Sequence, residues 1–92
     1  MNFFSTNIRL LRNRREVTQD MVARSLEVTR STVNSLENGS IKNPTVVMLV
    51  KLSDYYKVSI DALIKIDLST MNKFQLFEFM QYQKTNSING TR

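Results

Sequence analysis

Apolar residues recur at spacings of three and four along most of the chain, which is the period of an amphipathic helix. One proline and two glycines are all that interrupt this pattern. Residues that commonly cap helix N-termini stand before the apolar runs, at Ser5 or Thr6, Thr18, Thr29 and Ser59. The pattern predicts an all-α chain, with helices over residues 5–15, 18–26, 29–37 and 45–56, a short helix after Ser59 and a sixth over 73–83.

Two of the connections carry clear turn signals. Asn38 and Gly39 are expected to stop the third helix, because glycine readily adopts the left-handed conformation that follows a helix end. Pro44 is expected at the start of the fourth helix, where its missing N–H leaves no hydrogen bond unmade. Residues 67–70 are expected to form a linker.

The composition excludes several classes of function. The chain has no Cys and no His, so it lacks a disulfide framework, the usual zinc ligands and the commonest general base and nucleophile. The acids Asp54 and Asp61 stand apart and form no catalytic pair. We therefore expect neither an enzyme, nor a bound metal, nor a cofactor.

No part of the sequence approaches the ~20 apolar residues of a membrane span. The longest apolar run covers residues 46–50, which is the size of a core segment. The N-terminus lacks the basic and apolar regions of a signal peptide. A cytoplasmic protein with one small domain and a short tail is the expectation.

The chain carries 13 Lys+Arg and 8 Asp+Glu, a formal net charge of +5. This excess suits a polyanionic partner and ordinary solubility charge equally well. Residues 1–46 carry seven Lys+Arg and four Asp+Glu, and residues 47–92 carry six and four. Because the positive charge is spread evenly, it does not by itself indicate nucleic acid.

The most informative segment covers residues 19–36, where two short helices joined by a short turn form a predicted helix-turn-helix. Ala23 is small where the helices cross, and Val33 and Leu36 face the core. The outer face of the second helix is left with polar, non-acidic residues. Such a face suits reading of the DNA major groove, although it also suits a plain solvent-facing surface.

The segments TQDMVA (residues 18–23) and VTRSTVNSLENG (28–39), followed by Pro44, resemble the helix-turn-helix of the lambdoid phage repressor and Cro type, the XRE family. The resemblance covers about residues 5–66. It implies a five-helix, lambda-repressor-like DNA-binding domain, and the apolar pattern adds a C-terminal helix after it. One departure is Glu27, which stands where the family usually has a glycine with positive φ, and a non-glycine residue there costs roughly 1 kcal/mol.

The resemblance implies that a set of side chains around the third helix reads the bases. Thr29 and Arg30 would lie deepest in the groove, and Asn34 would lie at its wall. Arg30 is the best candidate for specificity, because a guanidinium pairs bidentately with guanine O6 and N7. The implied base-reading residues are Thr29, Arg30, Ser31, Asn34 and Ser35.

The resemblance also implies phosphate contacts around the reading helix. Lys42 would supply charge in the following loop, and Gln19 would meet a phosphate or reach toward the third helix. Arg12 and Glu37 would form an ion pair between the first and third helices, with a simple surface charge as the alternative for Arg12. The implied phosphate contacts are Gln19, Asn38, Ser40, Lys42 and Arg12.

The predicted sixth helix, with Asn72 as its cap candidate, is crowded with apolar side chains. A short helix this apolar does not stay exposed. It packs on its own domain, forms a dimer contact, or belongs to a linker in a longer protein. The side chains concerned are Phe74, Leu76, Phe77, Phe79, Met80 and Tyr82.

Residues 67–69 and 89–92 are similar to linkers that join such a domain to a C-terminal dimerisation and self-cleavage domain of the LexA and CI type. This similarity implies the N-terminal domain of a longer repressor. We expect three parts: a helix-turn-helix domain (residues 1–66), a linker with an amphipathic helix (67–84) and a flexible tail (85–92).

Together these features predict a sequence-specific DNA-binding transcriptional regulator, foremost a repressor. It would bind an inverted-repeat operator in double-stranded DNA as a homodimer, with residues 29–37 of each subunit in successive major grooves. The alternatives are an antitoxin or a restriction–modification controller of the same fold, and a protein-interaction module that does not bind DNA.

Overall fold

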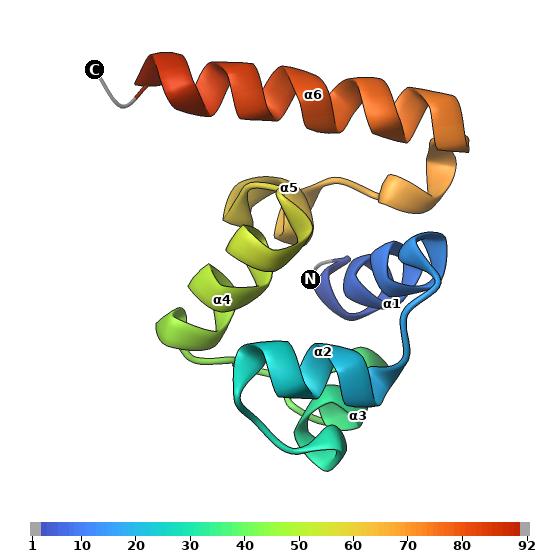
Figure 1. Ribbon diagram of the computed structural model, residues 1–92, viewed down its shortest axis with the longest axis vertical. Helices are drawn as coiled ribbons and strands as arrows, with labels where there is room; N and C mark the ends of the chain where they lie inside the picture. Colours follow the sequence, from blue (N-terminus) through green and yellow to red (C-terminus); the bar gives the residue numbers. More distant parts are fainter. Residues whose placement is uncertain (1–2, 91–92) are drawn as a thin grey trace.

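The computed structural model describes residues 3–90, and the side chains of residues 3–81. That part of the chain is all-α, as predicted, with the five helices of the helix-turn-helix domain followed by one more. The elements are α1 (Phe4–Arg15), α2 (Gln19–Leu26), α3 (Arg30–Asn38), α4 (Val46–Tyr56), α5 (Ile60–Lys65), the 3₁₀ turn η1 (Leu68–Thr70) and α6 (Lys73–Gly90). The helices α2 and α3 lie together at one end of the molecule, and α6 crosses the opposite end (Figure 1).

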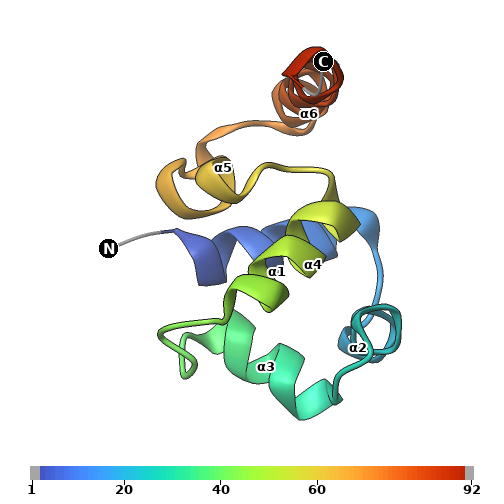
Figure 2. The ribbon, with the colours of Figure 1, turned by 90° about the vertical axis from the view of Figure 1, so that its left-hand side faces the viewer.

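The hydrophobic core surrounds α1, which contacts α3, α5 and η1. Figure 2 shows α1 in the middle of the molecule, with α3 on one side and α5 on the other. Ile8 of α1 and Leu68 of η1 are almost fully buried. Val33 and Leu36 face inward as predicted, and Ala23 is buried where α2 packs against α3.

Four helices begin at a hydroxyl side chain that accepts a hydrogen bond from the first turn of the helix. The side-chain oxygens of Thr18, Thr29, Thr45 and Ser59 each accept from the backbone N–H three residues on, at 3.1 Å. Such a cap is worth about 1 kcal/mol. The predicted caps Thr18, Thr29 and Ser59 are therefore confirmed.

Two predictions about helix starts are wrong. Ser5 and Thr6 do not cap α1, because its N-cap is Phe3 and Thr6 Oγ1 donates back to the Phe3 carbonyl oxygen at 3.1 Å. The helix starts earlier because Phe4, in its first turn, is buried in the core. Pro44 lies one residue before the N-cap of α4, since the threonine that follows it takes the capping position.

Several helices end at a residue with a left-handed backbone. Gly39 after α3 has a φ of 85°, as its predicted stop signal requires, and Glu16, Glu27 and Lys57 have φ values of 59°, 61° and 61°. Glu27 lies in the turn between α2 and α3. The strained non-glycine turn that the sequence implied is thus present.

Asn7 ties α1 to the segment that follows α5. Its side chain is buried, and Nδ2 donates to the carbonyl oxygens of Leu63 and Ile66 at 2.8 and 2.7 Å. Its Oδ1 accepts from the backbone N–H of Leu68 at 3.1 Å. Residues 67–70 therefore pack against the domain through η1 instead of forming the expected linker, because Leu68 supplies a core side chain.

The sixth helix starts where predicted and runs further. Asn72 Oδ1 accepts from the backbone N–H of Gln75 at 2.8 Å, and Gln75 Oε1 accepts from the Asn72 N–H at 3.0 Å. This reciprocal cap confirms Asn72 as the N-cap. The helix continues to Gly90, through residues 85–90 of the expected tail, because no proline or glycine interrupts it earlier. Tyr82 lies outside the residues whose side chains are described.

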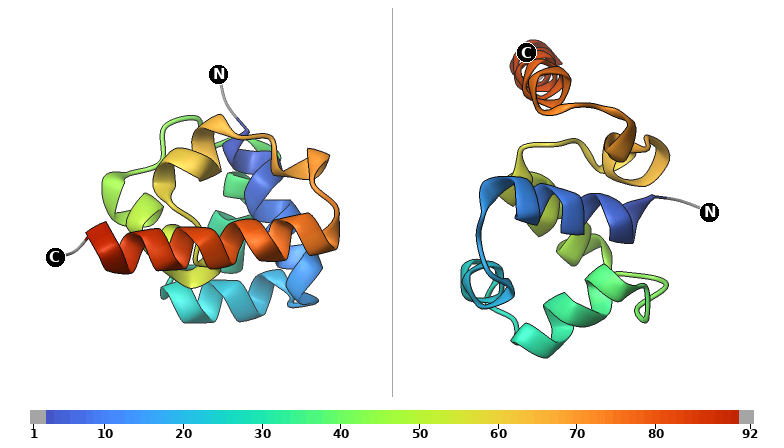
Figure 3. Two further views of the ribbon diagram at one scale, coloured as in Figure 1. Left: turned by 90° about the horizontal axis from the view of Figure 1, so that it is seen from above. Right: turned by 90° about the vertical axis from the view of Figure 1, so that its right-hand side faces the viewer.

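One face of α6 packs on the domain and another stays open. Leu76 is buried, and Phe79 and Met80 pack partly against the core. Phe74 and Phe77 are 68% and 60% exposed. Figure 3 shows the helix lying across the others. No helix in the described residues has the length and apolar content that a membrane span needs.

Candidate nucleic-acid interface

The outer face of α3 is polar because its apolar residues point inward. Val33 and Leu36 are buried, whereas Arg30, Ser31 and Asn34 are exposed. In Figure 2, α3 lies at the end of the molecule with no other helix beyond it. This face is therefore open to a large partner, while α2 and α1 pack behind it.

An ion pair fixes α3 against α1. The Arg12 guanidinium donates from Nε to Glu37 Oε2 at 2.7 Å and from Nη2 to Glu37 Oε1 at 3.1 Å. Bidentate pairs of this kind are among the stronger hydrogen bonds in proteins. The hydrogen bond with Glu37 raises the pKa of Arg12 above its ordinary value. The ion pair expected between these residues is present, and the Glu37 side chain is only 3% exposed.

Arg12 is directed toward the protein and not toward solvent. Its Nη1 donates to the carbonyl oxygen of Val17 at 3.0 Å, so three of its nitrogens are engaged within the chain. Its side chain is 16% exposed. The structure thus gives Arg12 a clear role in orienting α3, and its phosphate contact stays a prediction.

Gln19 joins this network from the start of α2. Its Nε2 donates to Glu37 Oε1 at 3.1 Å and to Asn34 Oδ1 at 3.4 Å. Gln19 was expected to meet a phosphate or to reach toward the third helix, and in the structure it reaches α3. The two helices of the motif and α1 are therefore held together by Arg12, Glu37 and Gln19.

Arg30 projects from the first turn of α3. Its Nε lies 4.0 Å from Asp20 Oδ1, and the two side chains are 68% and 59% exposed. An exposed ion pair is worth only about 0–1 kcal/mol, so the guanidinium remains free to bind a stronger acceptor. The sequence did not predict Asp20 as a neighbour of Arg30, although it places an acid in the first turn of α2 and a base in the first turn of α3.

The predicted base-reading hydroxyls differ in their exposure and in the hydrogen bonds that they already form within the chain. Thr29 Oγ1 accepts from the Thr32 N–H at 3.1 Å and shares a hydrogen bond of 2.9 Å with Thr32 Oγ1. Because a hydroxyl offers one donor and two acceptor positions, Thr29 keeps room for one further hydrogen bond. Ser31 is exposed, and Ser35 is half-buried.

The loop after α3 presents further polar groups. Asn38 Oδ1 accepts from the Ser40 N–H at 2.8 Å, which forms a local turn. Lys42 is exposed and forms no ion pair with any described residue. This loop follows directly on α3, so its side chains lie beside the open polar face.

The structure separates the predicted site residues into two groups. Those on the surface of α3, its cap and its loop are Thr29, Arg30, Ser31, Asn34, Ser35, Asn38, Ser40 and Lys42. Arg12, Gln19 and Glu37 form the network behind that surface. The sequence did not predict a role for Lys51. Its Nζ donates to the Leu26 carbonyl oxygen at 2.9 Å and ties α4 to the end of α2.

Residues 8–63 match a protein-family model described as helix-turn-helix. Among solved structures, the chain is similar in fold to one named SinR protein/SinI protein complex, with 23% identity and a TM-score of 0.65 over 91% of this chain and 97% of that chain. No curated protein matches the sequence. The family match covers more than half of the chain, including the whole of α2 and α3. The chain therefore belongs to the XRE-type helix-turn-helix family of DNA-binding transcriptional regulators.

Proposed function

We propose that this protein is a sequence-specific repressor that inserts α3 into the major groove of DNA. The observation that carries the proposal is the open polar face of α3, held in one orientation by Arg12, Glu37 and Gln19. A rigid reading helix has little conformational entropy to lose when it binds. Its short polar side chains suit the donor and acceptor pattern of base edges.

In this proposal Arg30 is the main source of sequence preference. Its exposed guanidinium would leave the weak pairing with Asp20 and bind the O6 and N7 atoms of a guanine. Ser31 and Asn34 would add hydrogen bonds along the groove, and Thr29 would use its remaining hydrogen-bonding position. Ser35, which is half-buried, would contact a base edge only at close approach.

Phosphate contacts would come from the loop beside α3. The Lys42 ammonium forms no ion pair with a described residue, and Asn38 and Ser40 present polar groups in the same loop. Gln19 and Arg12 would take part mainly through the network that orients α3. Contacts to phosphates set the position of the protein on the duplex and carry no base information.

A homodimer on an inverted repeat would place two copies of α3 in successive major grooves, about 34 Å apart. The exposed Phe74 and Phe77 on α6 offer an apolar surface for such an association. Bound in this way, the protein would repress transcription by excluding polymerase from the operator.

A second candidate function follows from the same apolar surface. The similar structure named above contains a complex of two different proteins, SinR and SinI. Phe74 and Phe77 would also suit a different protein partner that controls DNA binding, as in an antitoxin. The two candidates share the DNA-binding surface and differ in what covers α6.

The salt dependence of duplex binding tests the proposed function. The logarithm of the association constant should fall with the logarithm of salt concentration, by about 0.9 for each phosphate neutralised. Lys42→Ala should make that slope shallower by about one. The matched control is Lys65→Ala, because Lys65 is exposed and belongs to α5, which lies away from α3 in Figure 1.

A protein-interaction module without DNA binding predicts a different result. Neither the wild type nor any variant would shift a labelled duplex at low salt. A slope that Lys42→Ala and Lys65→Ala reduce equally would show general charge attraction and contradict the assigned phosphate contact.

A further inference from the structure

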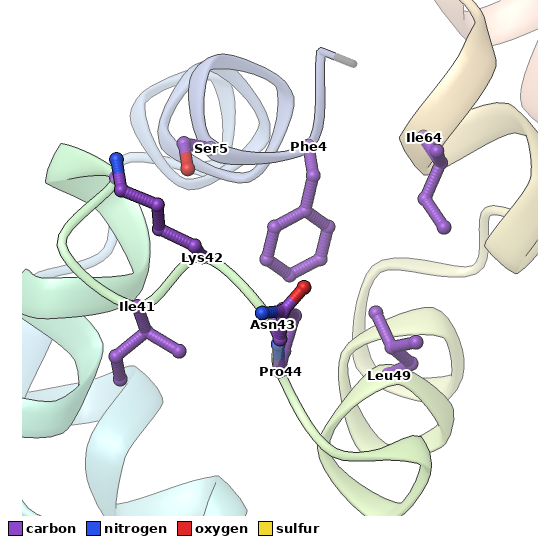
Figure 4. Close-up of a pocket in the computed structure, with 9 residues that line it drawn as sticks. Phe4, Ser5, Ile41, Lys42, Asn43, Pro44, Leu49 and Ile64 are labelled. Atoms are coloured by element: carbon purple, nitrogen blue, oxygen red, sulfur yellow. The ribbon is translucent and has the colours of Figure 1, made fainter. Parts of the chain in front are cut away.

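A hollow of about 480 Å³ opens beside the loop that follows α3. It lies between the first turn of α1, this loop, α4 and α5 (Figure 4). Its volume falls within the roughly 300–1,000 Å³ of small-molecule sites. Apart from Lys42, the residues that line the hollow take no part in the proposed contacts to DNA.

The walls of the hollow are largely apolar. Figure 4 shows the Phe4 ring pointing into it, with Leu49 and Ile64 on one side and Ile41 on the other. Pro44, which precedes the N-cap of α4, also lines the hollow. Apolar walls of this kind bind a hydrocarbon chain or ring by removing its surface from water.

The remaining side chains that line the hollow are polar. Among the residues that the structure describes, they are Ser5, Lys42 and Asn43, and none of the described lining residues is acidic. Figure 4 shows the Lys42 ammonium and the Ser5 hydroxyl on the same side of the space. Lys42 forms no ion pair among the described residues. The hollow thus combines apolar walls with an uncompensated cation, which is complementary to an anion that carries an apolar group.

We propose that this hollow binds a small amphipathic carboxylate. Its apolar part would lie beside Phe4, Leu49 and Ile64, and its carboxylate would accept hydrogen bonds from Lys42 and Ser5. Binding would also engage the ammonium of Lys42, so that it no longer contacts a phosphate. This effect on DNA rests on the proposed function, whereas the binding of the carboxylate does not.

The binding site is tested by titrating isotope-labelled protein with phenylbutyrate and following the backbone amide signals by NMR. The neutral comparison is phenylbutanol, which has the same apolar part without the charge. We expect saturable shifts at Gly39, Ile41 and Lys42, and a Kd for the acid about two- to fivefold lower than for the alcohol. Lys42→Gln should abolish that preference, and Lys65→Gln should keep it.

Three results would overturn the site. The first is the absence of a saturable shift, and the second is equal affinity for the acid and the alcohol. The third is a set of shifts confined to α6 near Phe74 and Phe77, which would mean that the probe binds the exposed apolar face. Lys42 is exposed, so Lys42→Gln should fold normally and its amide spectrum will verify this.

The link to DNA is tested by measuring duplex affinity with and without saturating phenylbutyrate. We expect the acid to weaken binding by the wild type about as much as Lys42→Gln does, and to have no further effect on Lys42→Gln. Unchanged affinity with the acid bound would overturn the link. If no duplex binds under any condition while the NMR shifts saturate, the proposed function fails and the carboxylate site stands.

Discussion

Arg30 is the side chain on which sequence discrimination depends most in the proposed complex. It is exposed, lies in the first turn of α3 and has only a weak ionic partner at 4.0 Å. Arg30→Ala should cost roughly 1–3 kcal/mol at the preferred sequence and little on unrelated DNA. Titration of labelled duplexes of both kinds measures this difference.

Lys65→Ala serves as the control for this loss of charge, because it removes an exposed cation from α5. It should leave the ratio of the two affinities unchanged. Equal losses on both duplexes for Arg30→Ala would show that Arg30 contacts a phosphate instead of a base.

Tyr56 shows how burial changes the chemistry of a side chain. It is fully buried, and its hydroxyl has no hydrogen-bond partner among the described residues. Burial raises the pKa of Tyr56, because the interior disfavours a phenolate. The Arg15 guanidinium lies 5.3 Å from the ring centroid and opposes the shift only in part.

The raised pKa of Tyr56 predicts a loss of stability at high pH. The neutral phenol favours the folded state below the unfolded pKa of about 10, and this contribution is lost as the pH rises through the folded pKa. Tyr56→Phe removes the group, so its free energy of unfolding should fall less steeply above that pH. Urea denaturation of both proteins, below and above pH of about 10, measures the difference. If the free energy of unfolding fell equally with pH in both proteins, the raised pKa of Tyr56 would be contradicted.

Single residues differ in how far the sequence predicts their roles. The pair Arg12 and Glu37 could be expected because the family resemblance includes both positions, and the structure contains it. Asn7 could not, because its partners are carbonyl and N–H groups of Leu63, Ile66 and Leu68. Those groups lie more than fifty positions from Asn7 in the sequence, and only the three-dimensional fold brings them next to α1.

The helix-turn-helix combines two capped helices with one strained turn between them. Thr18 and Thr29 cap α2 and α3, and Glu27 between them has a φ of 61°. A left-handed conformation costs a non-glycine residue about 1–2 kcal/mol. Glycine avoids that cost. It lowers the free energy of unfolding by about 0.5–1 kcal/mol, however, because the unfolded chain is more flexible at glycine.

Glu27→Gly should therefore raise the free energy of unfolding by about 0.5–1 kcal/mol. Chemical denaturation with circular dichroism measures it. Glu27→Ala is the control, because it removes the same charge and keeps the side-chain strain, and its stability should match the wild type. A gain of equal size in Glu27→Ala would assign the effect to charge and refute the strain.

Element boundaries follow the sequence where a local signal decides them. Thr18, Thr29, Ser59 and Asn72 are caps that act within three residues, so they could be predicted. The start of α1 and the packing of residues 67–70 could not, because the burial of Phe4 and Leu68 against distant helices decides both.

The exposed face of α6 has no packing partner among the described residues of the domain. Phe74 and Phe77 remain mostly exposed although Leu76 between them is buried. Replacing both with Ser should convert a dimer into a monomer at equal concentration, measured by analytical ultracentrifugation. Stability should change by about 0.5 kcal/mol or less, because surface substitutions usually do no more.

Lys73 is another exposed residue of α6, and Lys73→Ser should leave the oligomeric state unchanged. A wild type that is monomeric, or a double variant that stays dimeric, would remove α6 from the proposed homodimer. The sequence left three roles open for this helix, because its apolar residues cover more than one face and only packing decides which face is buried.

Selection of bound sites from random duplexes measures whether α3 reads a DNA sequence as part of a symmetric pair. We expect enrichment of an inverted repeat with half-sites one helical turn apart, about 34 Å. Arg30→Ala should relax the preference at one guanine in each half-site. A pool of duplexes that stays random through selection, with the folded protein present, would contradict sequence reading by α3.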